Sequence, residues 1–230
     1  MTEAISHLLE VNRIDIRYGT ATILQAAELS ISNGGIHLLV GRNGAGKSSL
    51  LRTMAGLQPL QGGSIVLNGR DVHAMSSAER AQNLAFVAST PPRTSQLRVE
   101  EVLRLAASNV ERASKVLAQY GDVAWAQQRM DALSDGQAQR VMFARAVLQE
   151  APWIFMDEPT AFLDVPSRRA FWTRAVQVAK QGTTLVLATH DYEQLAGAVE
   201  PASVHLIEAM KVVALDPKES PSDWTERMER

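Results

Sequence analysis

The chain has 230 residues, enough to bury a sizeable core, and this length predicts roughly one domain or two subdomains. It carries 23 Lys and Arg against 25 Asp and Glu, a balance that gives no sign of a nucleic-acid-binding surface. The absence of cysteine excludes disulfides, thiolate metal sites and a cysteine nucleophile. Its apolar runs have only the length of strands, and residues 1–10 lack the features of a secretion signal, so we expect a soluble, cytosolic protein.

The order of predicted elements indicates an α/β core interrupted by a helical insertion. Strands are predicted, in chain order, at 8–18, 23–31, 36–40, 64–67, 84–87, 153–156, 183–189 and 204–207. Helices are predicted at 49–55, 138–149 and 166–180, and all of 99–149 has helical spacing without a convincing strand. Gly19 and the pair Asn68-Gly69 mark turns. The charged segment 218–230 is predicted to be a surface tail with one helical turn.

The most informative stretch is a glycine-rich loop between the strand at 36–40 and the helix at 49–55. Its sequence is Gly41-Arg42-Asn43-Gly44-Ala45-Gly46-Lys47-Ser48. Three glycines let the backbone curl so that successive N–H groups point inward, which suits a polyphosphate. Lys47 can reach the terminal phosphates, the Ser48 hydroxyl can bind Mg²⁺, and the helix N-terminus adds partial positive charge. We therefore expect a nucleoside triphosphate to bind here.

Two carboxylates follow a second buried strand. The strand that begins at Trp153 ends in Asp157, and such strands deliver their last residue to the edge of the sheet where ligands bind. Asp157 is therefore the natural partner of the Mg²⁺ held by Ser48. Glu158 faces the same crevice and can orient and polarise a water for in-line attack on the γ-phosphate. Such carboxylates are common in α/β proteins, so these roles depend on the phosphate-binding loop.

A possible second anion site lies at Leu133-Ser134-Asp135-Gly136-Gln137, directly before the helix predicted at 138–149. One interpretation is a simple helix N-cap by Ser134 or Asp135. The other is a phosphate site, made by the serine hydroxyl, the glycine N–H and the helix N-terminus. Both interpretations use the same groups, and the residues alone leave both open.

In this order the motifs resemble those of the ATP-binding cassette (ABC) ATPases, over nearly the whole chain. Residues 41–48 resemble the Walker A loop, 133–137 the signature motif, 155–158 Walker B with its catalytic glutamate, and 162–164 the D-loop. His190 resembles the switch histidine that hydrogen-bonds the γ-phosphate. Tyr18 resembles the aromatic residue that stacks on adenine, where stacking is worth about 1–3 kcal/mol.

The resemblance implies a P-loop NTPase core with an antiparallel β subdomain and an inserted α-helical subdomain. The implied boundaries are a single domain at 1–217, with its core at 1–88 and 150–217 and its helical subdomain at 89–149, and a tail at 218–230. Two copies pack head to tail in this family, so each ATP lies between the P-loop of one and the signature of the other.

The resemblance also implies a full set of site residues. The catalytic residues are Glu158, His190 and Lys47. The nucleotide-binding residues are Tyr18, Gly41, Arg42, Asn43, Gly44, Ala45, Gly46, Lys47, Ser48, Ser49, Ser134, Gly136 and Gln137. The metal-binding residues are Ser48 and Asp157. Ser89 is a further candidate that either touches the water shell of the metal or the attacking water, or only caps the following turn.

The chain departs from the family pattern at two positions. Ser89 stands where the family usually has a glutamine that enters the helical subdomain, so we expect a weaker mechanical link between the γ-phosphate and the permease-binding groove. Asp135 stands where the signature more often has glycine. Its charge would repel phosphate unless it turns away to act as an N-cap acceptor.

The motifs at 133–137 and 159–166 are similar to those of the ATPases of iron-complex, haem and cobalamin importers. This implies an energising subunit on the cytoplasmic face of the inner membrane, bound to polytopic permease subunits and indirectly to a substrate-binding protein. A soluble ABC ATPase of iron–sulfur assembly or DNA repair is less consistent with the absence of a long coiled-coil insertion and of a basic surface. A small-molecule kinase would leave the signature and His190 unexplained, and a paired-cassette translation factor would need a second P-loop.

Overall fold

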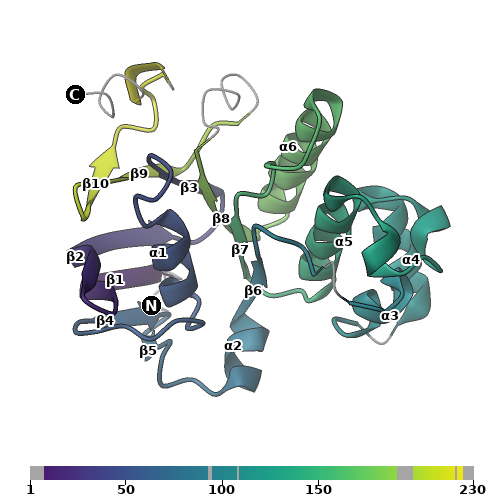
Figure 1. Cartoon of the computed structure of the whole chain (residues 1–230), viewed down its shortest axis with the longest axis horizontal. Helices are drawn as coiled ribbons and strands as arrows, with labels where there is room; N and C mark the ends of the chain where they lie inside the picture. Colours follow the sequence, from purple (N-terminus) through teal and green to yellow (C-terminus); the bar gives the residue numbers. More distant parts are fainter. Residues whose placement is uncertain (1–7, 93–94, 108, 191–198, 221, 225–230) are drawn as a thin grey trace, which may run out of the picture.

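The computed structural model of the chain describes residues 8–92, 95–107, 109–190, 199–220 and 222–224. It contains a four-stranded antiparallel sheet and a six-stranded sheet, with most of the helices grouped to one side (Figure 1). The antiparallel sheet has the order β2-β1-β4-β5. Its strands are β1 (Leu8–Tyr18), β2 (Ala21–Ser32), β4 (Ser64–Leu67) and β5 (Arg70–Asp71).

The six-stranded sheet carries the phosphate-binding loop and has the order β10-β9-β3-β8-β7-β6. Its strands are β3 (Ile36–Val40), β6 (Leu84–Val87), β7 (Trp153–Asp157), β8 (Thr184–Thr189), β9 (Ser203–Glu208) and β10 (Lys211–Leu215). All neighbours are parallel except β9 and β10. Every residue of β3, β7 and β8 is buried, which explains their continuous apolar sequences.

Helices cover both faces of this sheet and form a separate group beside it. They are α1 (Lys47–Met54), α2 (Ser77–Asn83), α3 (Val99–Arg104), α4 (Val110–Tyr120), α5 (Asp135–Leu148) and α6 (Val165–Lys180). Helices α3, α4 and α5 lie together on the side away from the antiparallel sheet (Figure 1). None of the helices in the described part of the chain is long and apolar enough to cross a bilayer.

Two apolar clusters hold these layers together. Successive residues of β8 alternate between them, because side chains alternate across a strand: Leu185 belongs to one cluster and Val186 to the other. The first joins one sheet face to α5 and α6. The second joins the opposite face to α1 and the antiparallel sheet. The second cluster therefore holds α1, and with it the loop that precedes α1, against the buried face of the sheet.

The predicted α/β architecture with an inserted helical region is confirmed, with two corrections. The helix after the second anion motif begins at Asp135 rather than Ala138, because a capping box fixes its start at Ser134. The segment from Lys218 is not simply a surface tail. Its Trp224 is only 2% exposed and belongs to the first apolar cluster, because burial of an indole outweighs the polarity of its neighbours. The sequence prediction also did not include α2, β5 and β10.

Candidate nucleotide-binding site

The phosphate-binding loop leaves β3 at Val40, as predicted, but α1 begins at Lys47, two residues before the predicted start at Ser49. Gly41 has φ 150°, and a Cβ there would lie 2.5 Å from the carbonyl oxygen of Ile207. Gly46 has φ 107°, and a Cβ there would lie 2.7 Å from Ile23 Cγ2. Only glycine fits both positions without a shift of neighbouring atoms. Because Gly46 is the N-cap of α1 and offers no side-chain acceptor, the first N–H groups of the helix are available to an anion.

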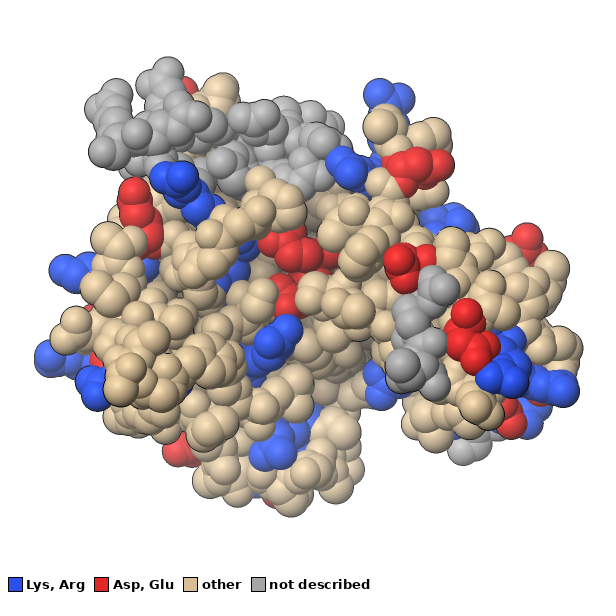
Figure 2. All heavy atoms as spheres, in the orientation of Figure 1, with Lys and Arg blue, Asp and Glu red and all other residues tan. Residues whose placement is uncertain are grey.

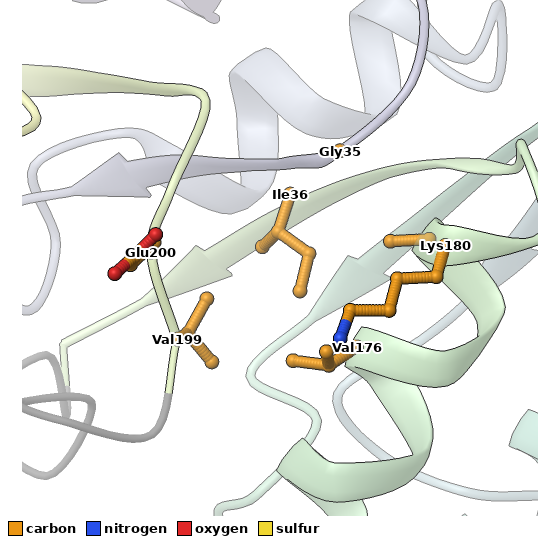
Figure 3. Close-up of a pocket in the computed structure, with 7 residues that line it drawn as sticks. Gly35, Ile36, Val176, Lys180, Val199 and Glu200 are labelled. Atoms are coloured by element: carbon orange, nitrogen blue, oxygen red, sulfur yellow. The ribbon is translucent and has the colours of Figure 1, made fainter.

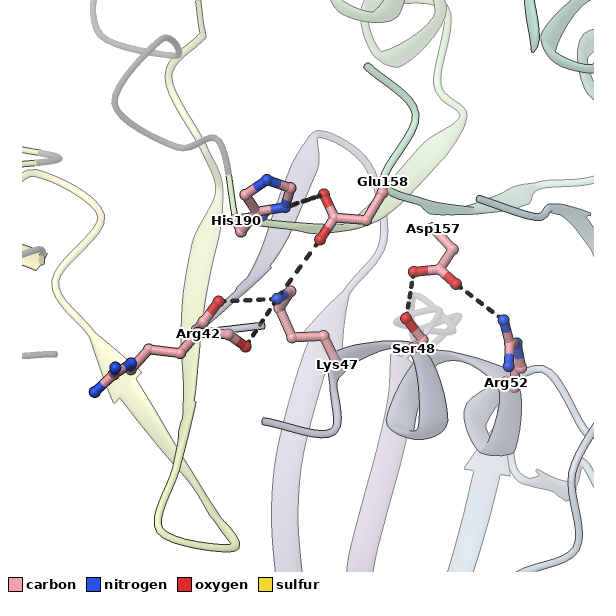
Figure 4. Close-up of polar contacts among 8 residues, drawn as sticks. Arg42, Lys47, Ser48, Arg52, Asp157, Glu158 and His190 are labelled. Atoms are coloured by element: carbon pink, nitrogen blue, oxygen red, sulfur yellow. Dashed lines mark hydrogen bonds and ion pairs between the residues drawn. The ribbon is translucent and has the colours of Figure 1, made fainter. Parts of the chain in front are cut away.

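The ammonium of Lys47 lies inside this loop. Its Nζ donates to the carbonyl oxygens of Gly41 at 2.8 Å and Arg42 at 3.2 Å, and lies 3.5 Å from Glu158 Oε1 (Figure 4). Burial lowers the pKa of Lys47, and the charge of Glu158 acts in the opposite direction. Phosphate oxygens entering the loop would replace these protein oxygens as acceptors.

A hydroxyl and a carboxylate meet beside the loop. Asp157 ends β7 and is fully buried, and its Oδ1 accepts a 2.7 Å hydrogen bond from Ser48 Oγ (Figure 4). Burial raises the pKa of Asp157, and the hydrogen bond from Ser48 and the charge of Arg52 oppose this shift. Hydroxyl and carboxylate oxygens are ligands that Mg²⁺ prefers, with waters and substrate phosphates completing its shell. A site of this kind needs no cluster of three acidic or histidine ligands, and the described residues contain none.

The carboxylate of Glu158 bridges the ends of two neighbouring strands. Its Oε2 lies 2.9 Å from His190 Nδ1 and accepts the His190 backbone N–H at 3.3 Å (Figure 4). The Glu158 N–H donates to the carbonyl of Ala188 at 2.8 Å. Since β7 and β8 are parallel neighbours, the residues that follow them meet at one edge of the sheet. The structure thus brings together Lys47, Glu158 and His190, as predicted from their order in the sequence.

Tyr18 stands at the end of β1 with its ring about half exposed. Its hydroxyl donates a 2.7 Å hydrogen bond to Gln58 Oε1, and Ser49 Oγ lies 3.5 Å from the same hydroxyl. Since Ser49 is in the first turn of α1, the Tyr18 hydroxyl lies beside the helix that follows the phosphate-binding loop. The prediction that the Tyr18 ring stacks on a base is compatible with this position.

The second anion motif forms a capping box at the start of α5. Ser134 Oγ accepts the N–H of Gln137 at 3.2 Å, and Gln137 Oε1 accepts the N–H of Ser134 at 2.8 Å. Ser134 is therefore the N-cap. The alternative that Asp135 caps the helix is wrong, because Asp135 already lies in the first helical turn. A Cβ on Gly136 would lie 2.9 Å from the carbonyl oxygen of Phe162, so this glycine allows close contact with the loop after Glu158.

Two predicted parts of the site form no hydrogen bond or ion pair with the P-loop among the described residues. Within the described ranges, no hydrogen bond or ion pair links Ser134, Gly136 or Gln137 to residues 41–48. Ser89 lies two residues after β6, is half-buried, and donates no side-chain hydrogen bond to any described residue. Its role at the metal stays a prediction.

The surface around the loop is concave and mixed in charge. A cavity of about 360 Å³ lies between residues 42–45 and residues 207–209. Acidic atoms lie in the hollow between the sheets and the helical group, and the basic groups of this face are scattered (Figure 2). A larger cavity of about 620 Å³ begins at Gly35 and is lined by Ile36, Val176 and Val199 (Figure 3). It lies at the start of β3, opposite the P-loop end, and takes no part in the site.

Sequence reasoning missed two residues that contact the predicted site. Arg52 Nη2 lies 3.3 Å from Asp157 Oδ2, and Gln58 holds the Tyr18 hydroxyl. Arg52 could have been found, because it follows Ser48 by four residues and so shares its helix face. Gln58 lies in an irregular segment after α1, and no pattern in the sequence pointed to it.

Comparisons with known proteins agree with this geometry. A profile of the ABC transporter family matches residues 24–161. The chain is 31% identical over 201 residues to an iron(3+)-hydroxamate import ATP-binding protein of Bacillus subtilis, covering 82% of this chain and 75% of that protein. It is 32% identical to a cobalamin import ATP-binding protein of Halobacterium salinarum, covering 82% and 50%. A solved structure described as the ATP-binding subunit of an ABC transporter superposes with a TM-score of 0.83 at 24% identity, covering 97% and 100%.

Proposed function

The chain belongs to the ABC transporter family as an ATP-binding, ATP-hydrolysing subunit, and from this we propose which residues bind the phosphates, hold the metal and activate the attacking water. The observation that carries the proposal is the convergence of Lys47, Glu158 and His190 at the end of the P-loop, beside the Ser48–Asp157 pair. A cation, a general base and a hydrogen-bond donor are thereby placed around one position, where the γ-phosphate would lie.

Each of these groups has a distinct role in the proposal. Lys47 and the N–H groups of the P-loop bind the β- and γ-phosphates. Glu158 orients the attacking water and accepts its proton, while His190 donates a hydrogen bond to the γ-phosphate. Ser48 and Asp157 hold Mg²⁺, whose chemistry is to neutralise charge on the phosphate oxygens. Tyr18 stacks on the adenine, and Gln58 keeps its ring in place.

The position of the signature supports a shared site. Ser134, Gly136 and the start of α5 offer groups suited to an anion, and among the described residues no hydrogen bond or ion pair joins them to the P-loop. We propose that these groups bind the γ-phosphate held by a second copy of the chain, so that two ATP molecules lie in a head-to-tail dimer. The chain would then be inactive as a monomer.

A groove supports the proposed membrane partner. It measures about 230 Å³ and lies where the end of α1, α2, β6 and α5 meet. Its lining residues are Ala55, Leu57, Ser77, Arg80, Ala81, Leu84, Phe86, Arg145 and Gln149. Five of these residues are apolar, two are arginines and none is acidic, which suits an amphipathic cytoplasmic helix of a permease. Bound there, the chain would lie peripherally on the cytoplasmic side of the membrane.

The proposed cargo is an iron complex or cobalamin, taken up with the help of a substrate-binding protein. The named relatives are import ATP-binding proteins for iron(3+)-hydroxamate and for cobalamin, and this is the support for the cargo class. The uptake of each candidate by cells with and without the chain is the direct test.

The partner proposal is tested by purification from detergent-solubilised membranes. The wild-type chain should copurify with a polytopic membrane protein, and Leu57→Glu should abolish this because Leu57 is 57% exposed in the groove. Val213→Glu is the matched control, since Val213 is 48% exposed on β10 and outside the groove. Both variants should still bind ATP. Copurification of no polytopic protein, or equal recovery with both variants, would contradict the proposed permease docking.

A further inference from the structure

The carboxylate of Asp157 is held at both of its oxygens by one helix. Ser48 Oγ donates to Oδ1 at 2.7 Å, and Arg52 Nη2 donates to Oδ2 at 3.3 Å (Figure 4). Ser48 and Arg52 are four residues apart in α1, so their side chains leave the same face of the helix. The guanidinium is therefore aimed at the carboxylate that the proposed function assigns to the magnesium site.

Among the described residues beside the P-loop, the carboxylates of Asp157 and Glu158 are paired with different cations. Lys47 is bound to Glu158 and to two loop carbonyls, whereas Arg52 is bound to Asp157. Asp157 is fully buried, and a buried carboxylate without a compensating charge is strongly unfavourable. Arg52 therefore supplies the charge that Asp157 needs when neither metal nor nucleotide is bound.

The two partners differ in their freedom to move. Asp157 is fixed at the end of a buried strand, whereas the Arg52 side chain is 40% exposed in the last turn of α1. Arg52 can turn into water at modest cost, and Asp157 cannot follow it. The Ser48 hydroxyl can keep its hydrogen bond to Asp157 while its lone pairs bind a metal, because it has one proton and two lone pairs.

We propose that Arg52 is an exchangeable counter-ion of the magnesium site: it neutralises Asp157 in the empty crevice and is displaced when Mg²⁺ enters with ATP. This inference rests on the proposed function, because it takes Ser48 and Asp157 as the metal site. It makes Arg52 a positioning residue that stabilises the nucleotide-free state and competes with the metal.

The test compares Arg52→Met, which keeps an aliphatic stem but removes the charge, with Arg52→Lys, which keeps a cation. Without ligands, Arg52→Met should lower Tm by about 2–4 °C, because the buried carboxylate loses its partner. With a non-hydrolysable ATP analogue, Mn²⁺ binding followed by electron paramagnetic resonance should tighten by about threefold to tenfold, because a competing positive charge has gone. Arg52→Lys should fall between Arg52→Met and the wild type in both measurements.

Arg70→Met is the matched control. Arg70 forms an exposed ion pair with Glu79 on other elements, so its loss should change neither the Mn²⁺ affinity nor the ligand-free Tm. Unchanged or weaker Mn²⁺ binding by Arg52→Met would contradict the proposed displacement of Arg52 by the metal. Arg52 would then only stabilise the fold. If the wild-type chain and the Arg70→Met control both fail to bind Mn²⁺ in the presence of the nucleotide, the proposed function itself is contradicted.

Discussion

Glu158 adopts a left-handed backbone conformation with φ 45°, which is uncommon for a non-glycine residue. Strain of this kind costs on the order of 1–3 kcal/mol and persists only where neighbouring contacts over-determine it. Here the N–H is held by Ala188 and the carboxylate by Lys47 and His190. The conformation directs the side chain towards Lys47 of the P-loop, where the proposed general base would act.

Replacing Glu158 by glutamine should keep ATP binding and reduce hydrolysis by about 10²–10⁴-fold, the usual contribution of a general base. The amide preserves the shape of the side chain and its hydrogen bonds to His190, but it cannot accept the proton of the attacking water. Phosphate release and nucleotide binding should be measured on the same sample. Near-normal turnover by Glu158→Gln would show that another group activates the water.

Two buried histidines are linked through Ser203, between β3 and β9. His37 Nε2 lies 2.8 Å from the carbonyl oxygen of Gly34, so this nitrogen carries the proton. Neutral His37 then accepts from the Ser203 hydroxyl at Nδ1, 2.8 Å away, and Ser203 accepts from His205 Nε2 at 2.9 Å. Burial lowers the pKa of His37. Burial, together with the positive charge that His37 carries once it is protonated, lowers the pKa of His205 to about 4.

Stability should therefore fall as the pH drops from about 6.5 towards about 4. In this window the unfolded chain binds a proton at His205 and the folded chain does not, so the free energy of unfolding rises with pH, by up to about 1.4 kcal/mol for each unit of the pKa shift. Above pH 6.5 the contribution is complete. Urea unfolding of the wild type and of His205→Gln across this range is the measurement, and the variant should show the smaller slope. Equal slopes would exclude His205 as the titrating group.

At the scale of single elements, the β9–β10 hairpin has an unfavourable turn sequence. Ala209 and Met210 form its two-residue loop, with φ 46° and 62°, although such turns favour Asn-Gly. The chain uses Asn68-Gly69 for the same purpose between β4 and β5, with φ 52° and 78°. The β9–β10 turn is fixed by its surroundings instead, since the Met210 carbonyl accepts the N–H of Gln25 at 2.9 Å.

Ala209→Asn combined with Met210→Gly should raise the free energy of unfolding by about 1 kcal/mol, because the backbone strain disappears while the carbonyl contact to Gln25 remains. The reverse exchange in the other hairpin, Asn68→Ala with Gly69→Met, should lower it by a similar amount. Denaturant titrations of both double variants test the pair. A lower free energy of unfolding for the β9–β10 double variant would mean that the apolar side chains of this loop outweigh its strain.

At the scale of the whole molecule, the proposed dimer makes activity depend on protein concentration. Ser134→Arg should leave nucleotide binding to the monomer intact but prevent ATP-dependent dimerisation. The long arginine side chain would replace the hydroxyl that is proposed to contact the γ-phosphate bound to the other copy of the chain. Ser114→Arg, on the exposed side of α4, is the matched control. Light scattering in ATP and specific activity against concentration are the measurements. Concentration-independent activity of a wild-type monomer would contradict the shared site.

The sequence predicted those parts of the molecule that depend on local rules or on strand order. The P-loop could be predicted from its glycines. The contact of Ser48 with Asp157, which is 109 residues later, could be predicted because both follow buried strands that end at the same edge of the sheet. The pairing of Arg52 with Asp157 was missed although it could have been predicted, because Arg52 follows Ser48 by four residues and so shares the helix face that meets Asp157. The burial of Trp224 was missed because its neighbours are polar, and the start of α5 because Ser134 and Gln137 cap each other.

The strand order has a consequence for synthesis of the protein on the ribosome. Strand β3 lies early in the chain and β7 in its second half, yet they are not paired, because β8 lies between them. Until residue 189 has emerged, the strand that carries the P-loop and the strand that carries Asp157 have no common neighbour. Strand β7 can pair with β6 as soon as it emerges, but β3 must stay unpaired until β8 has been made, and chaperone binding should concentrate in that interval.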